Sequence, residues 1–244
     1  MPSKITKKGS ICEAIITAKK ANHKLLAILL DPDKVNPETI DILVLKINQS
    51  PATHVFIGGS LVHNNAIDQL IIRIKQNCSL PIVLFPGNPS QISKLADGIL
   101  FLCLISGRNS DYLIEHHVNA VPLLKQSTLE IISTGYILIE SGGDTAVSLI
   151  SKTKPLDRNK SGYVVQTAQA GEMLGNKLIY LEAGSGAQSA VPLEMIRQVA
   201  ENIEVPLIIG GGITSRDAIQ QAYDAGADLV VIGTAFENDF EFFN

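Results

Sequence analysis

The sequence has few cysteines, no long apolar run and little excess charge, and each shortage excludes a class of protein. Its three cysteines, Cys12, Cys78 and Cys103, are odd in number, widely spaced and set among apolar residues. This usage favours reduced core thiols over a disulfide framework or a metal site. No stretch reaches the roughly 18 apolar residues that a membrane span needs, so no transmembrane segment is expected.

The charges are nearly balanced, with 20 Lys and Arg against 24 Asp and Glu and a net charge of -4. Nucleic acids and anionic membranes attract strongly basic surfaces, so the composition predicts neither as a partner. The N-terminal MPSKITKKGS is basic, but no apolar signal segment follows it. With the reduced cysteines, this predicts a cytoplasmic protein.

Apolar residues make up 45% of the 244 positions and gather in short runs separated by helix-length amphipathic segments. Nearly continuous hydrophobicity within a run indicates a parallel strand covered on both faces. Eight strands are predicted, at Leu25–Leu30, His54–Ile57, Ile82–Phe85, Ile99–Leu102, Tyr136–Ile139, Leu178–Glu182, Leu207–Ile209 and Leu229–Ile232. Their alternation with helices favours a (β/α)8 TIM barrel, as one domain over residues 1–244, above an open doubly wound sheet.

Helix signals lie between these strands. Asn36-Pro37 and Asn88-Pro89 each place a capping residue before a proline, and Thr214-Ser215 precedes another amphipathic run that Gly226 ends. An additional helix is predicted around Cys12–Ala21, and one of the barrel's own helices is expected to be modified or shortened.

The segment from Ser141 to Gly162 is polar, basic and rich in glycine, which predicts an irregular, mobile loop after the fifth strand. Two explanations stay open for it: a solvated surface, or a lid over an anionic substrate.

Active sites of barrels lie at the C-terminal ends of the strands. Strands seven and eight end in Gly210-Gly211-Gly212 and Gly233-Thr234. Glycines let backbone N–H groups approach a ligand, and a helix starting near Ser215 would direct its positive end to the same place. These features predict a phosphate site; the plainer alternative is a glycine turn before an ordinary helix cap.

The first and second strands end in Asp31 and Ser60. A carboxylate and a hydroxyl are hard oxygen ligands suited to Mg²⁺, which binds through one or two protein groups and substrate phosphates. Asp31-Pro32-Asp33 can also be read as a turn with a helix cap.

The sixth strand ends in IYLEAGSG, Ile179 to Gly186. Tyr180 and Glu182 are two residues apart and so share one face, while Leu181 points to the other. If the shared face is the barrel interior, Glu182 can accept a proton from a substrate hydroxyl; the alternative is a structural glutamate paired with a basic residue. The five histidines show no metal-ligand spacing, and Ser185 has no evident histidine partner for a hydrolytic triad.

Five strand-end segments together resemble the geranylgeranylglyceryl phosphate synthase family, which includes the bacterial PcrB-type heptaprenylglyceryl phosphate synthases. The resemblance covers about Leu25 to Phe236, and the combination is specific, although GGGI alone occurs in many phosphate-binding barrels. The segments are LLDPDK (Leu29–Lys34), IGGS (Ile57–Ser60), YLEAGSG (Tyr180–Gly186), GGGI (Gly210–Ile213) and IGTAFE (Ile232–Glu237).

The resemblance implies a Mg²⁺-dependent prenyltransferase of membrane ether-lipid biosynthesis. Such an enzyme joins the C3 hydroxyl of sn-glycerol 1-phosphate to a long prenyl diphosphate, here expected to be geranylgeranyl diphosphate, and releases diphosphate. A homo-oligomer is also expected. Transient contact with a membrane is expected because the donor and product are lipids.

By the same resemblance, Asp31 and Ser60 are the metal-associated pair, and Glu182 and Tyr180 are the catalytic residues, with Glu182 as the base. The acceptor site is then formed by Tyr180, Leu181, Glu182, Ala183, Gly184, Ser185, Gly186, Gly211, Gly212, Gly233 and Thr234.

One position and one segment differ from the pattern of the family. Leu29 stands where some bacterial members have a lysine, which makes the chain more similar to the archaeal-type group also found in some bacteria. Leu104–His117, LISGRNSDYLIEHH, matches only loosely, and this leaves the prenyl tunnel and the accepted chain length open. The alternatives are another phosphate-binding barrel, an isomerase or lyase of a small phosphorylated metabolite, and a phosphate-ligand binding protein without activity.

Overall fold

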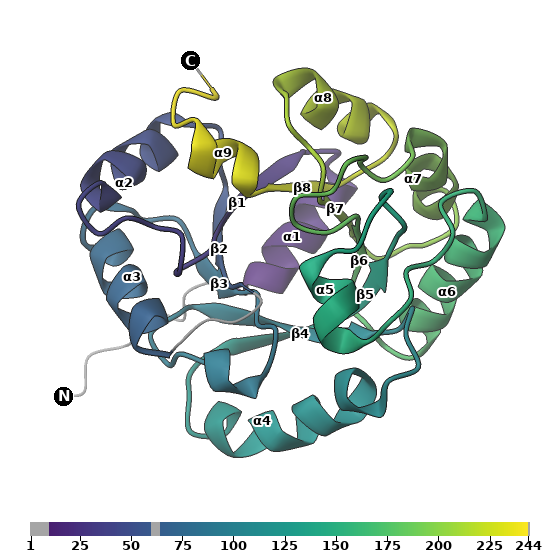
Figure 1. The fold of residues 1–244 in the computed structure, drawn as a ribbon, viewed down its shortest axis with the longest axis horizontal. Helices are drawn as coiled ribbons and strands as arrows, with labels where there is room; N and C mark the ends of the chain where they lie inside the picture. The colour runs from purple at the N-terminus through teal and green to yellow at the C-terminus, as the bar shows by residue number, and fades with distance from the viewer. Residues whose placement is uncertain (1–9, 60–63, 244) are drawn as a thin grey trace.

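The computed structural model describes residues 10–59 and 64–243. Its eight strands are all parallel and form a closed barrel in chain order, with β8 paired to β1 (Figure 1). The strands are β1 (Leu25–Leu30), β2 (His54–Ile57), β3 (Ile82–Leu84), β4 (Gly98–Leu104), β5 (Glu130–Leu138), β6 (Leu178–Glu182), β7 (Leu207–Gly210) and β8 (Leu229–Ile232). The predicted TIM barrel is confirmed.

Helices surround this barrel (Figure 1). They are α1 (Ile11–Lys20), α2 (Ile40–Gln49), α3 (Asn64–Asn77), α4 (His116–Leu124), α5 (Ala146–Ser151), α6 (Ser161–Met173), α7 (Leu193–Ala200), α8 (Arg216–Asp224) and α9 (Thr234–Asn238), with a 3-10 turn η1 (Pro89–Gln91) and a π-helical turn η2 (Asp111–Glu115). Between β3 and β4 the chain forms only η1, which is the shortened element expected from the sequence. Within the described part of the chain, no helix is both long and apolar enough to cross a membrane.

The local signals were partly right. Ser215 caps α8, since its hydroxyl accepts the N–H of Ala218 at 3.1 Å. The prediction of a cap at Asn36 was wrong: its side chain accepts the N–H of Glu38 in a turn, and α2 begins only at Ile40. A short side-chain turn competes with helix initiation at asparagine, and here the turn wins.

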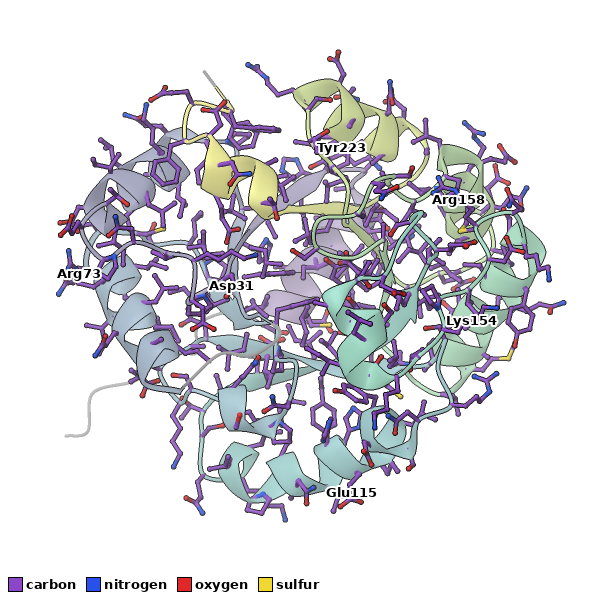
Figure 2. All side chains as sticks on the ribbon, viewed as in Figure 1. Asp31, Arg73, Glu115, Lys154, Arg158 and Tyr223 are labelled. Carbon is purple, nitrogen blue, oxygen red and sulfur yellow. The ribbon has the colours of Figure 1, made fainter. Side chains whose placement is uncertain are left out.

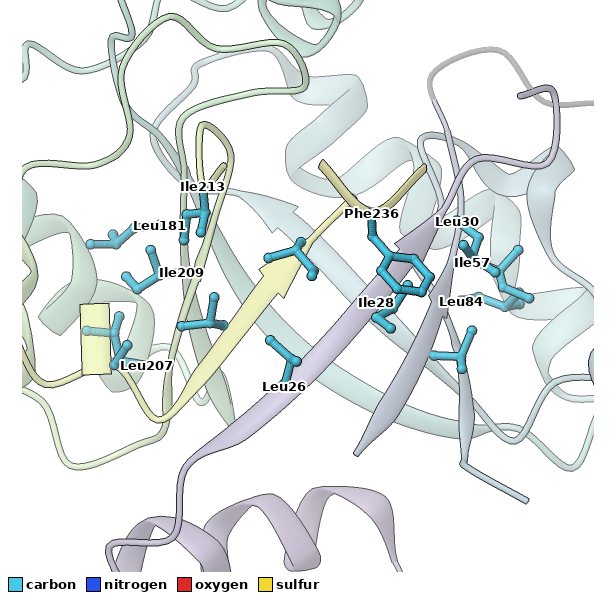
Figure 3. Packing of buried hydrophobic residues seen from close by; sticks show 14 of the residues in the cluster. Leu26, Ile28, Leu30, Ile57, Leu84, Leu181, Leu207, Ile209, Ile213 and Phe236 are labelled. Atoms are coloured by element: carbon cyan, nitrogen blue, oxygen red, sulfur yellow. The ribbon is translucent and has the colours of Figure 1, made fainter. Parts of the chain in front are cut away.

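The barrel has two apolar layers because strand side chains alternate. Outward-facing residues such as Leu26, Ile28 and Leu30 pack in the layer beneath the helices, where Phe236 of α9 joins them (Figure 3). Inward-facing residues such as Ala27 and Tyr180 form the second cluster, inside the barrel.

Helix α1 closes the N-terminal end of the barrel. Ile11 and Ile15 belong to the inner cluster, together with Leu25 and Leu229 at the starts of β1 and β8. The carboxylate of Glu130, at the start of β5, accepts the N–H groups of Ile11 and Cys12 at 2.6 and 2.9 Å, where the helix dipole favours negative charge. Only the C-terminal end is therefore left for a ligand.

The segment after β5 is more regular than its composition predicts. Thr145 caps α5 with a capping box, and Thr145, Ser148 and Ser151 are buried. Leu156 then exchanges backbone hydrogen bonds at 2.9 Å with Leu138 and Glu140. The expectation of an irregular loop from 141 to 162 was wrong for Ala146–Ser151, where small hydroxyl side chains satisfy their own backbone in a short helix, while residues 141–145 and 152–160 are irregular as predicted.

Candidate active site

Glu182 lies at the C-terminal end of β6 with only 5% of its surface exposed. As the alternation predicts, Tyr180 belongs to the inner cluster and Leu181 to the outer layer. One Glu182 oxygen, Oε1, accepts the N–H of Gly184 at 2.6 Å. Burial raises the pKa of the Glu182 carboxyl to about 7, although this hydrogen bond and the nearby Tyr180 hydroxyl act to lower it. A group with this pKa can take or give a proton near neutral pH.

The alternative of a structural ion pair is not supported at this position. The ion pairs found among the described residues join Lys and Arg side chains to other carboxylates, at the barrel rim and on the outer helices. No basic side chain contributes to the pKa of Glu182. Within residues 10–59 and 64–243 the carboxyl is thus buried without a counter-ion, which structural carboxylates generally avoid.

Two buried phenols lie beside Glu182. The ring centroids of Tyr136 and Tyr180 are 5.3 Å apart, and that of Phe85 lies 5.9 and 5.5 Å from them respectively. Burial, followed by the charge of Glu182, raises both tyrosine pKa values well above their usual range. Neither hydroxyl meets the geometry of a hydrogen bond within the described structure. Both stay protonated donors, available to a polar ligand group.

The glycines after β7 bring backbone directly against the end of β6. Gly211 has a φ of +79°, and a Cβ there would overlap Glu182 Oε1 and lie 2.8 Å from the backbone N of Ala183. Gly212 has a φ of +70°, and a Cβ there would lie 2.7 Å from the backbone N of Ala190. Any side chain would push these two loops apart, so the glycines are needed for the approach.

The remaining acceptor-site predictions fall around this contact. Gly210 pairs with Val231 near the ends of β7 and β8, so Gly211, Gly212 and Gly233 all follow the ends of neighbouring strands. Ala183 and Gly184 are buried, while Ser185 and Gly186 are exposed at the rim. The N-terminus of α8, capped by Ser215, and Thr234 at the start of α9 lie at the same end of the barrel. Glycine backbone and a helix N-terminus together suit a bound anion.

Asp31 lies just after β1, toward the middle of the view in Figure 2. Its Oδ2 is 3.3 Å from Lys34 Nζ, and its N–H donates to Glu237 Oε1 at 2.9 Å. Glu237 Oε2 is also 3.9 Å from Lys34 Nζ. The turn alternative is present too, since Asp31 Oδ1 accepts the N–H of Asp33 at 3.2 Å.

This donor set fits Mg²⁺. Asp31 offers a carboxylate with a fifth of its side chain exposed, beside the second carboxylate of Glu237, and Mg²⁺ needs only one or two such groups when phosphates supply the rest. Ser60, the other predicted metal residue, lies outside the described residues. In the described ranges, His, Cys, Asp and Glu form no group of three or more that could hold a metal by itself.

An apolar pocket opens next to the tyrosines, and the sequence, which left the prenyl tunnel open, did not predict its lining. It has an empty volume of about 700 Å³, open mouth included. It is lined by Phe85, Pro86, Gly87, Asn88, Pro89, Ile92, Ile99, Leu100, Phe101, Leu102, Leu104, Tyr112, His116, His117, Ala120, Tyr136 and Val147. Tyr136 belongs to both the lining and the cluster around Glu182, so the pocket adjoins the tyrosines beside the buried carboxyl.

Two histidines form part of the pocket wall. The His116 ring packs on Tyr112 with centroids 4.7 Å apart, and the His117 ring packs on Phe101 at 4.4 Å. Burial lowers the pKa of His117, so this ring favours the neutral form and brings no charge to the pocket wall. The adjacent HH in the sequence was the available signal, but only the packing of α4 on β4 shows which way the rings face.

Arg158 is a further residue that the sequence did not single out. It lies in the segment before α6 and is labelled in Figure 2, and its Nη1 and Nη2 donate to the carbonyls of Glu140 and Ala190 at 3.4 and 3.3 Å. Since Ala190 is the residue that Gly212 approaches, Arg158 ties the loop after β5 to the backbone that meets the glycine turn.

The sequence matches the PcrB family over residues 17–243. It is similar to a geranylgeranylglyceryl phosphate synthase of Flavobacterium johnsoniae, with 63% identity over 235 residues, covering 96% of this chain and 97% of that protein. A protein of the same name from Pyrococcus furiosus is 38% identical over 227 residues, covering 93% and 90%.

The fold is similar to the crystal structure of (S)-3-O-geranylgeranylglyceryl phosphate synthase from Thermoplasma acidophilum, solved in complex with its substrate sn-glycerol-1-phosphate. The TM-score is 0.91 at 29% identity, and the match covers 97% of this chain and 96% of that chain.

Proposed function

The chain belongs to the PcrB family and is an enzyme, and we propose that it joins the C3 hydroxyl of sn-glycerol 1-phosphate to geranylgeranyl diphosphate through an ether bond. The observation that carries this proposal is the position of Glu182, a buried carboxyl with a pKa of about 7, between a glycine-lined backbone and an apolar pocket. The names of the relatives, and the acceptor bound in the Thermoplasma protein, support the same reaction.

The acceptor is proposed to bind over β6, β7 and β8. Backbone N–H groups near Gly211, Gly212 and Gly233 and the N-terminus of α8 would hold its phosphate. The glycerol would then lie over the end of β6, with its C3 hydroxyl toward Glu182. This arrangement presents one hydroxyl to the base. It thereby fixes the orientation of the two reactants, which the same reaction in solution lacks.

The donor is proposed to lie with its hydrocarbon in the pocket beside Tyr136 and its diphosphate toward Asp31. A pocket with this many apolar and aromatic side chains favours a long hydrocarbon over the small polar metabolite of an isomerase or lyase. The donor therefore extends from an apolar end to a polar end of the barrel mouth, with its first carbon between them.

Asp31, beside Glu237, is the described residue that would hold Mg²⁺. When bound there, the ion would neutralise the diphosphate and make it a better leaving group. Lys34 Nζ lies within 3.9 Å of both carboxylates and can form an ion pair with the diphosphate as it leaves.

In the proposed reaction the bond between the first prenyl carbon and the diphosphate oxygen breaks, and its electron pair leaves with the diphosphate. The glycerol C3 oxygen forms a new bond to that carbon. Its proton passes to the carboxylate of Glu182. This carboxylate is buried, and its pKa of about 7 allows it to accept a proton near neutral pH. The faces of Tyr136, Tyr180 and Phe85 can stabilise positive charge that develops at the allylic carbon.

The test is an assay with purified protein, Mg²⁺, sn-glycerol 1-phosphate and radiolabelled prenyl diphosphates of graded length. We expect butanol-extractable labelled product that requires both substrates, with the geranylgeranyl donor preferred. No labelled product with any donor would refute the proposal. The homo-oligomer, the cytoplasmic location and the contact with a membrane stay predictions that this assay does not address.

A further inference from the structure

Gln91 is a buried amide that joins two strand-end loops. It ends the turn η1 after β3 and is 1% exposed. Its Oε1 accepts the N–H of Gly87 at 2.8 Å, and its Nε2 donates to the carbonyl of Gly59 at 2.7 Å. Both bonds are short and well formed, so the side chain links the loop after β2 to the loop after β3.

The two linked loops belong to different parts of the proposed donor site. Gly59 follows β2, which pairs with β1, and Gly58 donates its N–H to the carbonyl of Leu30, next to Asp31, at 3.1 Å. Gly87 belongs to the lining of the apolar pocket. Gln91 itself does not line the pocket, so it fixes the spacing between the polar and apolar ends through the backbone of these two loops.

We propose that Gln91 is a positioning residue for the prenyl donor, an inference that rests on the proposed function. The donor is an amphiphile whose diphosphate and hydrocarbon must be bound at the same time by the two sides that Gln91 joins. Their spacing determines where the first prenyl carbon lies relative to Glu182. Without the amide, the Gly59 carbonyl and the Gly87 N–H lose their partners, and the loops would shift to recover hydrogen bonds.

The acceptor side provides an internal reference. Its backbone lies on β6, β7 and β8, where Gly211 and Gly212 meet the loop after β6. Gln91 makes its hydrogen bonds to the loops after β2 and β3 instead. A donor-positioning role therefore predicts weaker donor binding with acceptor binding preserved, whereas general damage to the barrel would weaken both.

The experiment measures binding by calorimetry with Mg²⁺, using geranylgeranyl S-thiolodiphosphate, an unreactive donor analogue, and separately sn-glycerol 1-phosphate. Gln91→Met keeps the length of the side chain but removes both hydrogen bonds. The matched control is Gln198→Met, which removes a 2.9 Å bond to Glu194 on the outer helix α7. We expect Gln91→Met to weaken donor binding about tenfold, the loss of one or two buried hydrogen bonds, with acceptor binding within about twofold of the wild type and Gln198→Met unchanged in both.

Unchanged donor affinity in a folded Gln91→Met protein, or equal losses for donor and acceptor, would overturn the inference. If Gln91→Met does not fold, Gln91→Glu decides: it keeps an acceptor for Gly87 but places an oxygen against the Gly59 carbonyl, so donor affinity should again fall selectively. Failure of the proposed function itself gives a different result, because wild-type protein would then bind no prenyl analogue.

Discussion

The carboxylate of Glu182 accepts a hydrogen bond from the backbone N–H of Gly184, two residues further along the chain, at 2.6 Å. This bond holds one oxygen in place and leaves the other, Oε2, toward Tyr180 and the barrel interior. A carboxylate held in this way keeps a fixed direction for proton transfer, although no basic residue in the described part of the chain pairs with it.

Glu182→Gln should lower turnover by at least about a hundredfold, because the amide cannot accept the hydroxyl proton and general-base catalysis is commonly worth this much. The affinity for sn-glycerol 1-phosphate should change little, since the side chain keeps its size. Steady-state rates and calorimetric titrations measure the two quantities. Turnover close to that of the wild type would remove Glu182 from the role of base.

The raised pKa of Glu182 also predicts how its contribution to stability depends on pH. Between pH 4.5 and about 7 the folded protein holds a proton that the unfolded chain has released, so the free energy of unfolding falls as pH rises through this window. The difference between the two pKa values corresponds to about 3 kcal/mol. The contribution is fully present below pH 4.5 and is lost above about pH 7.

Urea unfolding of wild type and Glu182→Gln across this range tests the sign. The wild-type value minus the variant value should fall by about 3 kcal/mol from pH 4.5 to pH 8. His54, whose pKa burial lowers to about 4, changes stability in the opposite direction in both proteins and cancels in the difference. A difference that does not vary with pH would show that the carboxyl titrates normally.

Asp31→Asn should weaken the Mg²⁺ dependence of donor binding, because an amide oxygen is a poorer ligand for this ion than a carboxylate. The measurement is a Mg²⁺ titration of binding of the unreactive donor analogue. Asp33→Asn is the matched control: it lies in the same turn, is exposed, and uses its backbone N–H to contact Asp31. Identical Mg²⁺ titrations for Asp31→Asn and the wild type would contradict the assignment.

Gly211→Ala should abolish most activity, since the added Cβ overlaps Glu182 Oε1 and meets the backbone of Ala183. The control is Gly175→Ala. It has a similarly positive φ of +93°, but its Cβ would meet nothing within 4 Å. Both variants carry the left-handed strain of about 1 to 2 kcal/mol, so the larger loss of turnover expected for Gly211→Ala reports the steric overlap at the site. Equal activity in the two variants would be evidence against the close approach.

Arg158→Met should raise the KM for sn-glycerol 1-phosphate about fivefold with little change in kcat, because two long hydrogen bonds to loop carbonyls are worth about 1 kcal/mol. Arg73→Met, which removes an exposed ion pair with Asp41, serves as the control and should change neither constant. If Arg158→Met changed only the KM for the donor, the residue would act on donor binding, and its assignment to the acceptor side would be wrong.

The sequence could predict the barrel and the direction of Tyr180 and Glu182, because both follow from periodicity along single strands. The pocket could not be predicted in this way. Its wall combines the loop after β3, strand β4 and helix α4, and which side chains meet there depends on how separate elements pack. The contact between Asp31 and Glu237 could be predicted in part. In a closed barrel the end of strand eight adjoins strand one, so the fold implies that the two residues lie close together. The hydrogen bond between them could not be predicted.

The pairing of β1 with β8 has a consequence for the synthesis of the chain. Leu25 lies opposite Leu229, Tyr223 donates to the Leu25 carbonyl at 2.8 Å, and Lys24 reaches the carbonyl of Ala227 at 3.0 Å. These contacts join residues about 200 positions apart, so a growing chain on the ribosome has two unpaired sheet edges until its last strand emerges. The two halves of the proposed site, Asp31 and Gly233, meet only then, and a truncated product has neither a complete barrel nor a complete site.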